Sequence, residues 1–112
     1  MNQFAVMLIT TPTREEAENL TDLLLKQKLA ACVNILPVAS HYWWKGKIED
    51  AEETLMLVKT QRRLISKIVK LVQIHHSYEI PEIIALPIIE GSQEVVLLRL
   101  VEDIALLDVL LS

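Results

Sequence analysis

Apolar positions change their spacing along the chain, and each change predicts a different element. Residues 4–9 form a continuous apolar run that stops short of Pro12. Such a run predicts a strand that is buried on both faces or central in a sheet. Apolar residues then recur at helical spacing over residues 14–28, after Thr13 and Glu16, which have the spacing of a capping box. The chain therefore opens with a strand followed by an amphipathic helix.

The spacing of apolar residues, together with proline and glycine, also predicts the elements in the middle of the chain. Residues 61–74 repeat the helical spacing, with arginine, lysine and glutamine on the other side. Pro37 favours an edge strand or a bulge, because proline cannot donate to a sheet ladder. Gly46, after the aromatic residues of segment 41–47, predicts the end of a hairpin arm. Three segments are predicted to be extended: 30–38, 54–60 and 83–89.

The predicted order is strand, helix, strand, strand, helix, strand, with a helical tail after Gly91. This is the split βαβ pattern of an α+β, ferredoxin-like βαββαβ sandwich with an extended hairpin, and residues 1–112 are expected to form one such domain. Both helices then cover one face of an antiparallel sheet. Hydrophobic residues make up 52% of the chain and aromatic residues only 4%, so apolar surface remains for the other face. A homo-oligomer is expected to cover it.

Charge and cysteine content exclude several classes of protein. The net charge is −4, and lysine and arginine are scattered, so nucleic acid is not an expected partner. Cys32 is the only cysteine, which excludes an intrachain disulfide and favours a reducing cytoplasm. The N-terminus lacks the basic region of a signal peptide. Charged residues interrupt the apolar segment 95–111, so we expect no transmembrane span.

Side chains that can bind a metal or a ligand are concentrated between the second predicted helix and the last predicted strand. Residues 75–82, His-His-Ser-Tyr-Glu-Ile-Pro-Glu, hold two imidazoles, a phenol and two carboxylates, which suit a metal or a small ligand. His75 and His76 are adjacent, so on regular backbone their side chains point apart and do not readily chelate one ion. The alternative is two polar residues at a helix C-terminus. No nucleophile, base and orienting group can be identified, so no enzyme is predicted.

Four blocks of the sequence carry a resemblance to a known family. They are KLAACVNILP at 28–37, YWWKGKIE at 42–49, LVKT at 57–60 and YEIPEIIALP at 78–87. Together they resemble the CutA family of divalent-cation tolerance proteins. The resemblance implies a ferredoxin-like protomer, a homotrimer with its sheets around the threefold axis, a cytoplasmic setting, and weak or exchangeable binding of copper or another divalent cation. The likeness of that architecture to trimeric PII proteins leaves two alternatives: a sensor of a small effector, or a scaffold, with incidental metal binding.

The resemblance also assigns expected roles to residues. The expected metal ligands are His75, His76 and Cys32, although a lone buried cysteine is more often a core residue. The residues expected to line a cleft between protomers are Lys59, Arg62, Tyr78, Glu79 and Glu82. The residues expected at the trimer interface, rather than as a ligand-stacking surface, are Tyr42, Trp43 and Trp44. Two positions depart from the family pattern: Ile9 stands where some copper-binding members carry a cysteine, and Ser77 replaces a proline.

Overall fold

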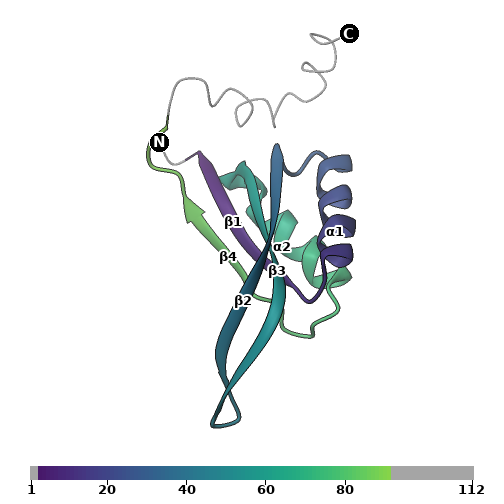
Figure 1. The fold of residues 1–112 in the computed structure, drawn as a ribbon. Helices are drawn as coiled ribbons and strands as arrows, with labels where there is room; N and C mark the ends of the chain where they lie inside the picture. Colours follow the sequence, from purple (N-terminus) through teal and green to yellow (C-terminus); the bar gives the residue numbers. More distant parts are fainter. Residues whose placement is uncertain (1–2, 92–112) are drawn as a thin grey trace.

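The computed structural model describes residues 3–91, which form a four-stranded antiparallel sheet and two helices (Figure 1). The strand order is β2-β3-β1-β4. The elements are β1 (Phe4–Thr11), α1 (Arg14–Lys26), β2 (Cys32–Trp44), β3 (Lys47–Gln61), the 3₁₀ turn η1 (Arg62–Leu64), α2 (Ile65–His75) and β4 (Ile83–Pro87). The predicted α+β, ferredoxin-like βαββαβ fold is confirmed. The predicted helical tail lies outside the described residues.

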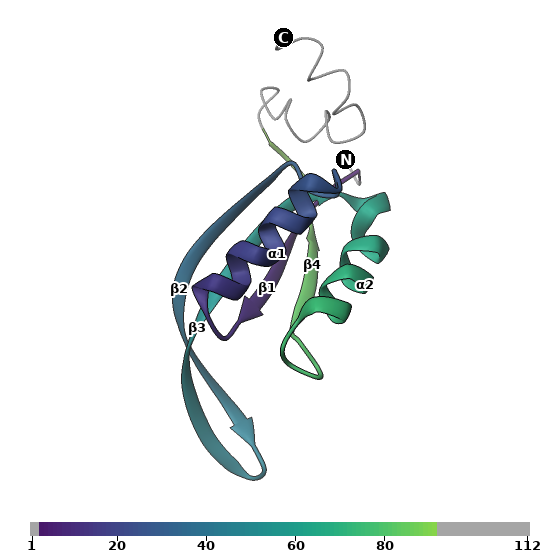
Figure 2. The same ribbon diagram turned by 90° about the vertical axis from the view of Figure 1, so that its right-hand side faces the viewer.

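Two layers enclose the core. Helices α1 and α2 lie side by side over one face of the sheet, and the β2–β3 hairpin extends beyond them (Figure 2). The residues in the core that are almost completely buried are aliphatic: Met7, Ile9, Ala17, Leu20, Leu24, Met56, Val58, Ile68 and Val72. The predicted aliphatic core is therefore the contact between the two helices and the central strands β1 and β3.

Helix α1 begins as predicted and ends two residues early. The Thr13 hydroxyl accepts a hydrogen bond from the Glu16 amide at 3.2 Å, which caps the first turn. Lys28 has a φ of 59°, and the Leu29 amide donates back to the Leu24 carbonyl at 2.9 Å. This is a Schellman ending with a lysine in the left-handed position that glycine usually occupies. The prediction of a helix through Lys28 was wrong because the usual stop residue is absent.

The hairpin is longer than predicted. Trp44 pairs with Lys47, so Lys45 and Gly46 alone make the turn, with φ values of 50° and 78°. Positive φ at both positions is the type I′ geometry that matches the twist of two paired strands. Pro37 lies within β2, which is an edge strand, as expected for a residue that cannot donate to a ladder.

The face of the sheet opposite the helices is mostly apolar over β1 and β4 and includes Lys59 of β3. The register aligns Leu86, Val6 and Lys59 in one row. The next row holds Ile84, Leu8 and Leu57. Ile84 and Leu86 are 41% and 45% exposed. No helix among residues 3–91 is long and apolar enough to cross a membrane.

Candidate functional site

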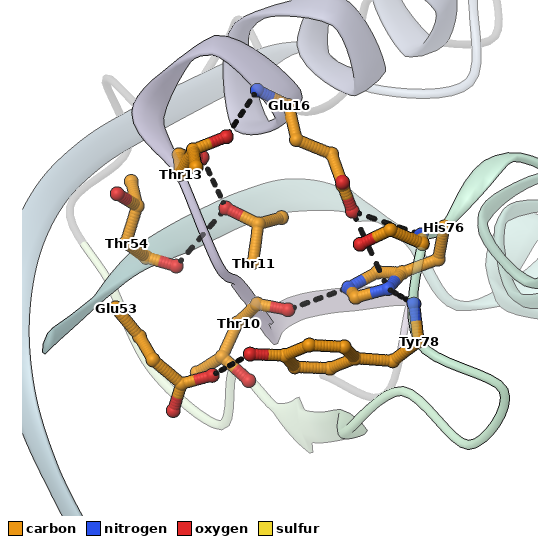
Figure 3. A network of polar contacts seen from close by, with 9 residues as sticks. Thr10, Thr11, Thr13, Glu16, Glu53, Thr54, His76 and Tyr78 are labelled. Atoms are coloured by element: carbon orange, nitrogen blue, oxygen red, sulfur yellow. Dashed lines mark hydrogen bonds and ion pairs between the residues drawn. The ribbon is translucent and has the colours of Figure 1, made fainter. Parts of the chain in front are cut away.

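His76 is the buried centre of a polar network just after α2 (Figure 3). Its Nε2 lies 2.7 Å from the Thr10 carbonyl oxygen, and its Nδ1 lies 2.9 Å from the Tyr78 amide nitrogen. Because a carbonyl only accepts and an amide N–H only donates, the hydrogen sits on Nε2 and Nδ1 accepts. Both ring nitrogens are therefore occupied by protein partners.

His75, the preceding residue, is exposed at the end of α2. Its Nδ1 lies 2.9 Å from the Leu71 carbonyl oxygen, so Nδ1 carries the hydrogen and Nε2 has a free lone pair. No described residue hydrogen-bonds to this Nε2. The two neighbouring rings thus face different surroundings, as expected for adjacent histidines. Of the two, His75 has the ring nitrogen that is able to bind an incoming ligand.

Glu16 links the first helix to this network. Its carboxylate accepts a hydrogen bond from the Ser77 amide at 3.1 Å and lies 3.4 Å from His76 Nδ1. The sequence pattern assigned Glu16 to a capping box, and only the Thr13 half of that box forms with the Glu16 backbone. The Glu16 side chain instead anchors the segment after α2 to the start of α1.

Tyr78 connects the same segment to the hairpin. Its hydroxyl donates to the Glu53 carboxylate at 3.0 Å, and its ring centroid lies 5.1 Å from that of His76. Partial burial, followed by the hydrogen bond and the negative charge of Glu53, raises the pKa of Tyr78 above its ordinary value. The phenol therefore stays a hydrogen-bond donor into alkaline solution.

A groove of about 440 Å³ lies between α1 and the end of α2. Its polar lining consists of Thr13, Glu15, Glu16, Asn19 and His75. Carboxylates, an amide and an imidazole are ligand types that divalent cations accept. Within residues 3–91, however, no three His, Cys, Asp or Glu side chains stand close enough to hold a metal ion. The groove supplies donor groups without a closed, preformed coordination site.

Within one chain, Cys32 and Lys59 lie far from the His76 network. Cys32 and Lys59 are opposite each other on β2 and β3, and Lys59 also pairs with Val6 near the start of β1. His76 contacts Thr10 at the other end of β1, four residues along. Lys59 is thus about 13 Å along the sheet from the His76 contact. The predicted grouping of Lys59 and Arg62 with Tyr78 does not form within one protomer and stays a prediction about the assembly.

Glu79 and Glu82 are exposed in the segment between α2 and β4, beside Tyr78 in sequence. Their predicted role in a cleft also stays a prediction. Sequence reasoning did not single out Glu15 or Asn19 as partners of His75. The only signal for the region was the acidic first turn of α1, which the helix dipole explains equally well.

The predicted interface aromatics lie at the end of the hairpin. Tyr42, Trp43 and Trp44 are 44%, 73% and 57% exposed in the single chain. Alternation along β2 places Tyr42 and Trp44 on one face and Trp43 on the other. The Lys45 ammonium lies 5.6 Å from the Trp44 ring centroid. These side chains are unburied by their own protomer, and their interface role stays a prediction.

Comparison with known proteins agrees with the resemblance seen in the sequence. The family profile described as CutA1 divalent ion tolerance protein matches residues 5–97. The chain belongs to the CutA1 divalent ion tolerance family. It is 49% identical over 86 residues to the divalent-cation tolerance protein CutA of Archaeoglobus fulgidus, covering 77% of this chain and 84% of that protein. It is 42% identical over 90 residues to the protein CutA homolog of Danio rerio, covering 80% of this chain and 60% of that protein.

Solved structures of CutA proteins share the fold. The periplasmic divalent cation tolerance protein CutA from Archaeoglobus fulgidus superposes with a TM-score of 0.83 at 43% identity, covering 89% of this chain and 96% of that one. The matched length varies among CutA relatives, since the chain spans less than two thirds of the Danio rerio protein. Family and fold are therefore shown by both sequence and structure.

Proposed function

We propose that this protein binds divalent cations, copper first, in metal tolerance or homeostasis, and that it does so without catalysis. The observation that carries the proposal is the inter-helix groove, where the free Nε2 of His75 shares one surface with Glu15, Glu16 and Asn19. Membership of a divalent ion tolerance family supports it. His76 contributes by holding the backbone after α2 in place.

The donor set favours weak, exchangeable binding. One imidazole with nearby carboxylates suits copper above other first-row divalent ions, which follows the general order of affinities. Without three positioned ligands among residues 3–91, water completes the coordination and the ion exchanges readily. Such a site fits a protein that buffers metal ions rather than one that needs a metal to fold.

The proposed working form is a cytoplasmic homotrimer. The apolar sheet face and the exposed hairpin aromatics are surfaces that a second copy would bury. The single cysteine supports a reducing compartment. Assembly would also bring residues from different protomers together, which is how Lys59 and Arg62 could approach Tyr78.

A thermal-stability series tests the proposed ligand. A cation that binds only the folded protein raises the unfolding temperature as its concentration rises. We expect a saturable rise with Cu²⁺, a smaller rise with Zn²⁺ and no rise with Mg²⁺. Equal effects of Mg²⁺ and Cu²⁺, or no effect of any of the three, would contradict the proposal.

A further inference from the structure

Glu16 belongs to two features of the molecule at once. Its side chain lines the groove between α1 and α2, and its carboxylate accepts a hydrogen bond from the Ser77 amide at 3.1 Å. Oε2 makes this bond, and Oε1 has no hydrogen-bond partner among residues 3–91. One carboxylate is therefore able to hold the segment after α2 with one oxygen and to receive a cation with the other.

The Ser77 amide is the donor that fixes the direction of this carboxylate. The Glu16 side chain is only 19% exposed and points from α1 toward the His76 ring (Figure 3). His76 Nδ1, 3.4 Å away, already accepts from the Tyr78 amide, so it offers the carboxylate a lone pair rather than a hydrogen. A hydrogen bond to a carboxylate is stronger than one between neutral groups. Loss of the Ser77 N–H would thus free a side chain that has several rotamers.

Ser77 supplies this donor because it is not a proline. It stands where the family pattern has a proline, and a proline nitrogen carries no hydrogen to donate. His76 has φ and ψ of −78° and 141°, an extended conformation that a following proline also accepts. The backbone is therefore compatible with either residue, but only a residue other than proline makes the bond to Glu16.

The segment of residues 77–82 is held by few contacts. It forms no helix or strand, and Ile80 is 88% exposed. Within the described part of the chain, hydrogen bonds hold only its first two residues, Ser77 and Tyr78. Segments with few buried contacts open locally at a small cost in free energy. The bond to Glu16 therefore has a measurable effect on how often this segment opens.

We propose that cation binding in the inter-helix groove and ordering of residues 77–82 are linked through the Glu16 carboxylate, with Ser77 as a positioning residue. The Ser77 amide holds the carboxylate at the groove, and a cation bound by His75 and Glu16 fixes the same carboxylate beside the Ser77 amide. Linkage is reciprocal, so each event favours the other by the same factor. The linkage rests on the proposed cation binding and adds a route from the bound ion to the exposed segment.

Calorimetric titration with Cu²⁺ at one pH tests the positioning role in the full-length protein. It compares the wild type with Ser77→Pro and with Ser77→Ala, the matched control that keeps the amide hydrogen. We expect Ser77→Pro to bind Cu²⁺ about fivefold more weakly, because the carboxylate loses its donor and regains rotamer freedom. Ser77→Ala should bind as the wild type does.

Hydrogen–deuterium exchange, followed by mass spectrometry, tests the reciprocal effect. In the wild type, saturating Cu²⁺ should slow exchange of the amides of residues 77–80 by about fivefold. In Ser77→Pro, Cu²⁺ should leave exchange of the remaining amides of this segment unchanged. The wild-type measurement does not depend on how well the proline variant folds.

The two experiments separate failure of the linkage from failure of the proposed function. If the wild type binds Cu²⁺ but Ser77→Pro binds it equally well or more tightly, the linkage is overturned and the cation site stands. The same holds if Cu²⁺ leaves exchange of residues 77–80 unchanged, or if Ser77→Ala weakens binding as much as Ser77→Pro. If the wild type does not bind Cu²⁺, the proposed function fails and the linkage fails with it.

Discussion

His76 illustrates how one side chain ties three segments of the molecule together. Its ring satisfies the Thr10 carbonyl of β1 and the Tyr78 amide of the next segment, and it approaches Glu16 of α1. Burial increases the free energy that is lost when these hydrogen bonds are broken, because a buried polar group without a partner has also lost its hydration. We therefore assign His76 a structural role and His75 the ligand role.

Replacing the two histidines one at a time tests that division. We expect His76→Ala to lower the free energy of unfolding by about 2 to 4 kcal/mol, through a cavity and two unpaired backbone groups. His75→Ala, at an exposed helix end, should change it by less than about 1 kcal/mol. Urea unfolding at one fixed protein concentration makes the comparison, and equal effects of the two variants would contradict the assignment.

The raised pKa of Tyr78 predicts a dependence of stability on pH. Because the pKa is higher in the folded state, the folded protein holds this proton to higher pH than the unfolded chain. The stabilisation is complete below the ordinary tyrosine pKa of about 10 and is lost as pH rises through the folded-state value. Wild-type stability should fall more steeply above about pH 10 than that of Tyr78→Phe. Equal slopes above about pH 10 in the two proteins would contradict the assignment of this proton to Tyr78.

At the scale of elements, local patterns predicted most of the fold. Helical spacing and the Thr13 cap located α1, and the apolar run at 4–9 located the central strand β1. The extended hairpin was predicted, but residues 47–53 were not assigned to its returning strand, because they are mostly polar and pair with residues 38–44 of β2 rather than with the core. The end of α1 was missed because Lys28 takes a conformation that its residue type rarely adopts.

The hairpin turn offers a test of the element that carries the aromatic tip. Gly46 has a φ of 78°, and a Cβ at this position would meet nothing within 4 Å. Gly46→Ala should therefore destabilise through backbone strain alone, by about 1 kcal/mol. Lys45→Asn should stabilise by about 0.5 kcal/mol, since asparagine tolerates positive φ. Chemical denaturation measures both changes, and a neutral Gly46→Ala variant would contradict the type I′ assignment.

At the scale of the whole molecule, the exposed sheet face is the surface that a homotrimer would bury. Leu86→Glu would place a charge on the edge strand β4, beside Val6 of β1 on that face. We expect light scattering to show a smaller assembly for this variant. Ile74→Glu, at a side chain 76% exposed on α2, is the matched control and should keep the wild-type mass. A wild-type monomer, or a Leu86→Glu variant with unchanged mass, would contradict the proposed trimer.

The candidate site was only partly predictable because its contacts join distant parts of the chain. The histidines stood out by residue type, but the contact between His76 and Thr10 spans 66 positions. No local pattern predicts which of two adjacent histidines turns inward. The inter-helix groove likewise depends on how α1 and α2 pack, so Glu15 and Asn19 become neighbours of His75 only in the folded molecule.

Calorimetric titration with Cu²⁺ tests the central claim most directly. It compares the wild type with His75→Ala and with Gln73→Ala, an exposed position on the same helix that does not line the groove. Removing the one available imidazole should weaken copper binding by at least about tenfold, while Gln73→Ala should bind as the wild type does. Copper affinity that is unchanged in His75→Ala would contradict the account.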